Sequence, residues 1–174
     1  TCSSIERWVS GDPALIRVMP NTPALIGAGI SALYANSNVG VDQRALAEKI
    51  VTAVGKTVWI EEESLMDAVT AVSGSGPAYF FYVMQAIHDA AVREGLDAQT
   101  ARLLTLETTL GAARLALAST EDPGNLQAQV TSPGGTTEAA IKVLNDSGVR
   151  DTLQQAVSAA RARGGELAKL LDRD

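Results

Sequence analysis

The stretch at residues 130–145 reads VTSPGGTTEAAIKVLN, and its pattern predicts a turn that leads into a helix. Two adjacent glycines, Gly134 and Gly135, allow positive φ and a close approach of the backbone to a ligand. The free N–H groups of the first helical turn then point at one spot, where an anion is favoured. Three hydroxyl side chains surround that spot: Ser132, Thr136 and Thr137.

Two interpretations of this turn stay open from the residues alone. One is a cradle that holds a carboxylate by backbone N–H groups, with hydroxyls as further donors. The other is ordinary helix capping, with Thr or Ser at the N-cap and Glu138 near the first turn. Caps are far commoner than binding sites, so physical reasoning by itself favours capping.

A second glycine-rich stretch, SGSGPAY at residues 73–79, predicts the start of a helix, with Pro77 at the first helical position. The glycines could allow close backbone approach to a ligand or another subunit, or could simply connect two helices tightly. The surrounding residues 68–87 carry no formal charge over a length that could span a membrane. Because the glycines and Pro77 interrupt that run, two helices in a soluble domain explain it better.

From residue 62 onward the pattern is helical throughout. Helices are predicted near 64–72, 77–95, 98–118, 123–130, 135–146 and 149–171. The helix at 77–95 is apolar on most sides, with Gln85, Asp89 and Arg93 on one narrow polar face. A helix of this kind is normally buried, which in a small domain suggests that a partner chain covers it. Gly164 and Gly165 should loosen the last helix locally.

Residues 1–61 have a different texture. The end of a helix is predicted at 4–9, strands at 14–19, 30–35 and 56–60, and a helix at 42–53 with Asp42 as its N-cap. This order suggests the last part of an α/β layer rather than a whole sheet. The pattern G-x-G-x-x-A at residues 27–32, with Glu48 beyond it, resembles a dinucleotide fingerprint. We reject that match because it leads into a strand instead of a helix.

Composition narrows the function classes. The chain has 174 residues, 46% of them hydrophobic, and a formal net charge of -6 without a basic stripe, which argues against a nucleic-acid surface. The single cysteine, Cys2, and the single histidine, His88, leave no usual zinc ligand set. His88 is expected to be a packed or surface residue. No signal peptide is recognised, and the balance of acidic and basic residues is typical of a soluble cytoplasmic protein.

Three motifs of the chain resemble motifs of the pyrroline-5-carboxylate reductases, and they follow one another along the chain in the order typical of that family. Residues 130–145 resemble the signature of that family, residues 73–79 resemble its SGSGPAY segment, and RVMPNTP at 17–23 resembles the strand end that faces its cofactor. The resemblance covers Ser3 to about Leu167, but the family's glycine-rich phosphate loop has no counterpart in the chain. It implies a mainly α-helical C-terminal domain at 62–174, a bundle like that of 6-phosphogluconate dehydrogenases. The last strands of a Rossmann-like α/β domain would precede it at 1–61.

The resemblance also implies an activity, a cofactor and a partner. The parent enzyme would reduce 1-pyrroline-5-carboxylate to L-proline with NADP(H) or NAD(H), as a homodimer formed by the helical domain. Thr137 would be the catalytic residue, and substrate-binding residues would be Ser132, Gly134, Gly135, Thr136 and Thr137. The nicotinamide end of the cofactor would lie near Met19, Pro20 and Asn21. Alternatives are an inactive helical dimerisation fragment of that enzyme or an unrelated module that binds small carboxylates.

Overall fold

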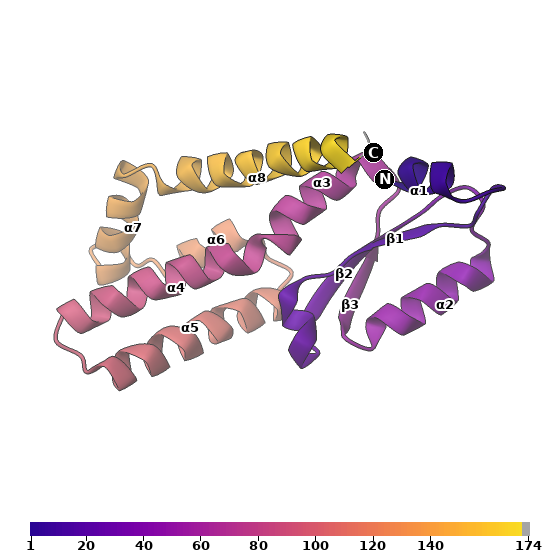
Figure 1. Cartoon of the computed structure of the whole chain (residues 1–174). Helices are drawn as coiled ribbons and strands as arrows, with labels where there is room; N and C mark the ends of the chain where they lie inside the picture. The colour runs from indigo at the N-terminus through magenta and orange to yellow at the C-terminus, as the bar shows by residue number, and fades with distance from the viewer. Residues whose placement is uncertain (172–174) are drawn as a thin grey trace. The chain divides into compact units, whose positions relative to one another are not determined.

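The computed structural model describes residues 1–171 and divides into two compact units (Figure 1). One unit contains residues 1–78 together with the chain from Gln155 onward, and the other contains residues 79–154. The functional boundary predicted between residues 61 and 62 stays a prediction. The change from mixed to helical structure, however, begins at Glu63, close to that position.

The predicted strands and helices are confirmed, with small shifts at their ends. The predicted N-cap Asp42 is wrong, because α2 begins at Val41 with Gly40 as its N-cap and Asp42 is its second residue. Their bounds are α1 Cys2–Trp8, β1 Ile16–Met19, η1 Thr22–Ile26, β2 Gly29–Ala35, α2 Val41–Thr52, β3 Gly55–Trp59, η2 Glu63–Leu65, α3 Met66–Val69, η3 Thr70–Gly74, α4 Gly76–Arg93, α5 Ala98–Ala118, α6 Pro123–Gln129, α7 Thr136–Asp146 and α8 Val149–Leu171. Gly95 and Gly148 adopt positive φ after α4 and α7, as helix-ending glycines do.

The helix predicted at 64–72 is more complex than its sequence suggested. A 3₁₀ turn at 63–65 leads into a short α-helix, and a π-helical turn follows at 70–74. The π turn is closed by the N–H of Ser75, which donates to the carbonyl of Thr70 at 2.8 Å. Pro77 is therefore the second residue of α4 and not its first. Hydrophobic periodicity cannot register one extra residue in a turn, so this feature escaped prediction.

The first unit is built on a three-stranded sheet in the order β1-β2-β3. Strand β1 pairs antiparallel with β2, and β2 pairs parallel with β3. The parallel pair begins with Gly29 opposite Gly55. Position 55 requires glycine, because a Cβ there would lie 2.0 Å from the carbonyl oxygen of Gly29 and because the residue has a φ of 152°. Central strand β2 supplies much of the core, with Leu33 fully buried.

The G-x-G-x-x-A stretch behaves as expected for a spurious fingerprint. Gly27 ends η1 in a left-handed conformation, and Gly29 starts β2, so no helix follows. Glu48 is held on the sheet, where its carboxylate oxygens accept from the Thr57 hydroxyl at 3.3 Å and the Trp59 indole at 3.5 Å. The strand predicted after these glycines is confirmed, so the stretch lacks the helix that a dinucleotide fingerprint opens.

The second unit has little core of its own. Among residues 79–154, Ala101 is the one buried hydrophobic side chain. On α4, Phe80 is 64% exposed and Tyr82 is 79% exposed. Among the described residues, the backbones of helices α4 to α8 do not run close to another helix or strand over several residues. The apolar helix at 77–95 is thus uncovered within the single chain. None of the helices in residues 1–171 has both the length and the apolar character that a membrane span requires.

The narrow polar face predicted for α4 is present. Gln85 donates to Asp89 at 2.7 Å, and Nδ1 of His88 lies 3.1 Å from the same carboxylate. These contacts, that of His88 first, hold the pKa of Asp89 below its usual value. His88 is a partly exposed surface residue, as expected. Helix α8 continues unbroken through Gly164 and Gly165.

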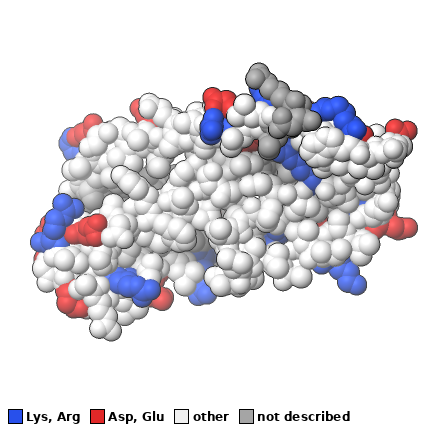
Figure 2. Space-filling view, in the orientation of Figure 1, with Lys and Arg blue, Asp and Glu red and all other residues white. Residues whose placement is uncertain are grey.

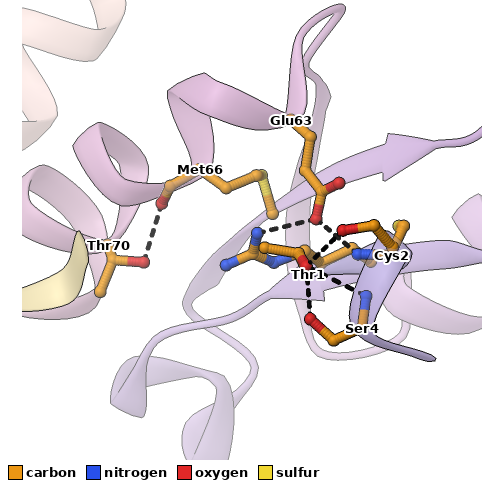
Figure 3. Close-up of polar contacts among 8 residues, drawn as sticks. Thr1, Cys2, Ser4, Glu63, Met66 and Thr70 are labelled. Atoms are coloured by element: carbon orange, nitrogen blue, oxygen red, sulfur yellow. Dashed lines mark hydrogen bonds and ion pairs between the residues drawn. The ribbon is translucent and has the colours of Figure 1, made fainter. Parts of the chain in front are cut away.

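Glu63 ties three separate segments of the first unit together (Figure 3). Its Oε1 accepts from the backbone N–H of Cys2 at 2.8 Å and from Nη1 of Arg17 at 3.0 Å. The Glu63 side chain is only 21% exposed, so the ion pair is partly shielded from water. One carboxylate therefore links the start of α1 and strand β1 to the first helical residues after the sheet.

Glu63→Ala is expected to lower the free energy of unfolding by about 1.5–3 kcal/mol, because it removes an acceptor shared by a backbone N–H and a guanidinium. Urea denaturation of the 174-residue chain measures the change. Glu61→Ala removes the same charge at an exposed position and should change the free energy by less than about 0.5 kcal/mol. Equal losses in the two variants would contradict a structural role for the shared carboxylate.

Candidate functional site

The turn before α7 brings the predicted substrate residues together on one short segment. Gly134 adopts a left-handed φ of 73°, and Gly135 is the N-cap of α7. The N–H of Gly135 donates to the carbonyl of Ser132 at 3.0 Å, which folds the turn back toward the helix start. Ser132 and Thr136 are exposed, and Thr137 is half-buried. The two glycines thus serve the turn as their sequence predicted.

The capping interpretation is not supported for the hydroxyls. No side chain caps the N-terminus of α7, because the N-cap residue is Gly135. Within residues 1–171, the hydroxyl of Thr137 has no hydrogen-bond partner. The N–H groups of Thr136 and Thr137 belong to the first turn, where the helix itself offers no acceptor. The turn therefore presents two backbone donors and one half-buried hydroxyl.

Glu138 has a role that the sequence analysis did not assign. Its Oε2 accepts from the N–H of Gly134 at 2.8 Å, so one donor of the predicted cradle is already engaged by a carboxylate of the same chain. The signal for this contact was present, since an acidic residue at the third helical position often reaches back to a preceding N–H. This bond also shows that the turn geometry accommodates a carboxylate.

A shallow open depression extends from the glycine turn along one side of α7. It is flanked by the ion pair between Lys142 and Asp146, whose atoms are 2.5 Å apart. Its lining residues are Gly134, Gly135, Glu138, Ala139, Ile141, Lys142, Asn145 and Asp146. Thr137 is not among the residues that line this depression.

The predicted cofactor residues lie together in the first unit. Met19 ends β1, and Asn21 is the residue before η1. The side-chain oxygen Oδ1 of Asn21 accepts from the N–H of Ile30 at 3.0 Å, and its side-chain nitrogen Nδ2 donates to the hydroxyl of Ser73 at 3.4 Å. The structure therefore joins the strand end at 17–23 to the glycine-rich stretch at 73–79, a contact that separate motifs could not reveal.

The residues of the chain fit only part of a nicotinamide dinucleotide. At the strand end, Met19 and Asn21 are half-buried and Pro20 is exposed. The glycine pattern at 27–32 enters a strand and supplies no helix N-terminus for the pyrophosphate. Among residues 1–171, no three His, Cys, Asp or Glu side chains are grouped so that they could hold a metal ion.

Two curated proteins illustrate the similarity of the chain to known sequences. The pyrroline-5-carboxylate reductase of Pseudomonas aeruginosa is 50% identical over 170 residues, which are 98% of this chain and 62% of that protein. The reductase of the same name from Synechocystis is 48% identical over 95% of this chain and 62% of its own length. The chain thus spans about three fifths of the length of these relatives.

Solved structures give the same result for the fold. A pyrroline-5-carboxylate reductase from Coxiella burnetii superposes with a TM-score of 0.92 at 46% identity, over 96% of this chain and 62% of that one. The Plasmodium falciparum pyrroline carboxylate reductase, solved with NADP bound, gives a TM-score of 0.81 at 32% identity, over 86% of this chain and 61% of that one. The mainly helical fold preceded by Rossmann-like strands is confirmed.

The family model described as "Pyrroline-5-carboxylate reductase dimerisation" matches residues 63–167. The matched segment begins at Glu63, where the helical part of the chain begins, and it includes both the π turn and the turn before α7. On this match and the similarities above, the chain belongs to the pyrroline-5-carboxylate reductase dimerisation family.

Proposed function

We propose that this chain is part of a pyrroline-5-carboxylate reductase that reduces 1-pyrroline-5-carboxylate to L-proline. The observation that carries the proposal is the family match at residues 63–167, which contains the glycine turn and α7. Because the chain spans 62% of its relatives' length, the proposed enzyme has further residues outside this segment. Those residues would hold the pyrophosphate of the cofactor, for which the described residues offer no cradle.

The substrate is a five-membered cyclic imine with one carboxylate. A reduced nicotinamide, NADPH or NADH, supplies the hydride that joins the imine carbon, and the ring nitrogen ends protonated as a secondary amine. A protonated iminium is already electrophilic, so the site needs positioning and hydrogen bonding more than a strong acid or base. A helical segment whose one histidine lies on the surface of α4 is compatible with such chemistry.

The turn before α7 would bind the carboxylate through backbone N–H groups from Gly134 to Thr137. The N–H groups of Thr136 and Thr137 are available for this, and the positive end of the helix favours the negative charge. Ser132 would line the pocket. The bond between Glu138 and the N–H of Gly134 would be exchanged for, or kept beside, the bond to the substrate.

Thr137 would hold the ring nitrogen through its hydroxyl. The hydroxyl is half-buried, and no residue between 1 and 171 bonds it. On the cofactor side, Met19, Pro20 and Asn21 would contact the nicotinamide part of NADP(H) or NAD(H). The relative from Plasmodium falciparum, solved with NADP, supports this cofactor class.

Self-association follows from the uncovered helices, and we propose a homodimer. Large apolar side chains stay exposed on α4 and α5, including Phe81 at 62% and Leu117 at 87%. Figure 2 shows that much of the visible surface carries no charged side chain. An extensive apolar surface of this kind marks a protein interface. We place the enzyme in the cytoplasm, where Cys2, the one cysteine of these 174 residues, would stay a thiol.

Thr137→Ala in the full-length reductase is expected to lower kcat roughly ten- to a hundredfold while affecting substrate binding less. The backbone donors to the carboxylate remain, whereas a hydrogen bond to a group charged for part of the reaction, about 1.5–3 kcal/mol, is lost. An interaction that strengthens in the transition state acts on kcat. Steady-state kinetics with 1-pyrroline-5-carboxylate measures both constants.

Thr137→Ser retains the hydroxyl and serves as the matched control, with most of the activity kept. A thermal melt of both variants separates catalysis from helix stability. If Thr137→Ala melts at a lower temperature but turns over at the normal rate, the proposed role of this hydroxyl is wrong.

The 174-residue chain alone is expected not to bind NADPH at micromolar concentrations, because it lacks the N–H cradle that holds the pyrophosphate. Titration calorimetry of the chain with NADPH tests this, with the full-length reductase as the positive control. Micromolar affinity in the chain alone would show that residues within it form a nucleotide site. In that case the proposal that residues outside this segment hold the pyrophosphate would be wrong.

A further inference from the structure

The end of strand β1 rests against the π turn at 70–74, within the first unit. We propose that Gly74 is a positioning residue: its missing side chain makes room for the methyl group of Met19 and so fixes the strand end that meets the nicotinamide. The inference rests on the proposed function, since that function places the cofactor at Met19 to Asn21. It assigns a role to the glycine-rich stretch that its sequence left undecided.

Space, and not backbone conformation, distinguishes Gly74. A Cβ on Gly74 would lie 2.5 Å from Cε of Met19, so the flexible end of the Met19 side chain would have to move, whereas the 3.6 Å to Cγ2 of Thr70 is ordinary contact. Gly74 is not among the glycines with positive φ. Its neighbour Gly76 has no atom within 4 Å of the corresponding position. The two glycines of one motif therefore have different reasons to be glycine.

Two polar contacts extend the same junction. The hydroxyl of Ser73 accepts from Nδ2 of the Asn21 side chain at 3.4 Å, and Oδ1 of the same side chain accepts from the N–H of Ile30. The Asn21 side chain is thus held between the π turn and the start of β2. Within residues 1–171, strand β1 pairs with β2.

The π turn itself explains how the contact is made. The extra residue in this turn is closed by the bond from Ser75 to Thr70, and the Thr70 hydroxyl donates to the carbonyl of Met66 at 2.8 Å. Such turns occur frequently at functional sites, because they displace residues from the regular helical surface. Here the displacement places Gly74 against Met19 and Ser73 beside Asn21.

The first test is a double-mutant cycle in the 174-residue chain, which contains both residues and needs no cofactor. Gly74→Ala should lower the melting temperature by about 1–4 °C, because the end of the Met19 side chain has to leave its preferred position. In the background of Met19→Leu, whose shorter side chain removes the clashing methyl, the same change should lower it by less than half as much. Gly76→Ala, the matched control, should cause no comparable loss.

The second test uses the full-length reductase and the dissociation constant of NADPH, measured by titration calorimetry. Gly74→Ala should raise this constant about tenfold in the wild-type background and less than threefold in the Met19→Leu background. Equal effects in both backgrounds, or no effect of Gly74→Ala in either experiment, would overturn the inference. If the wild-type full-length protein fails to bind NADPH, the proposed function fails instead, while the melting cycle still decides the contact.

Discussion

Large apolar side chains on helices α4, α5, α7 and α8 stay exposed among residues 1–171 of one copy, and this unburied surface is the constraint that self-association has to satisfy. The described core lies almost entirely around the sheet and α3, whereas the second unit buries one hydrophobic side chain, Ala101. Its helices approach one another sparsely. A unit of this kind gains its hydrophobic stabilisation from association, because apolar surface left in water contributes nothing to folding.

This constraint also explains where a reductase would place its chemistry. The glycine turn before α7 supplies backbone donors and a half-buried hydroxyl without using any strongly acidic or basic group. The first unit supplies a strand end fixed by Asn21, Ser73 and the space at Gly74. The two sets of residues belong to different units.

Much of the fold could be predicted from the sequence, because helices and strands follow periodicity, glycine positions and β-branched runs. The predicted site residues on the turn also fall on one segment, since they are adjacent in sequence. Contacts between distant segments could not be predicted in this way. Glu63 with Arg17, Asn21 with Ser73, and Met19 with Gly74 depend on side-chain packing that no local pattern encodes. The π turn was missed for a different reason, because hydrophobic periodicity does not reveal one extra residue in a helical turn.

The central claim is that the helical segment is completed by a second copy. Sedimentation velocity of the 174-residue chain at micromolar concentration tests this claim most directly, because the apolar helices are all present in it. A chain of 18.1 kDa should sediment as a species of twice that mass, with no stable monomer on dilution to low micromolar concentration. A folded monomer of 18.1 kDa throughout that range would contradict the account.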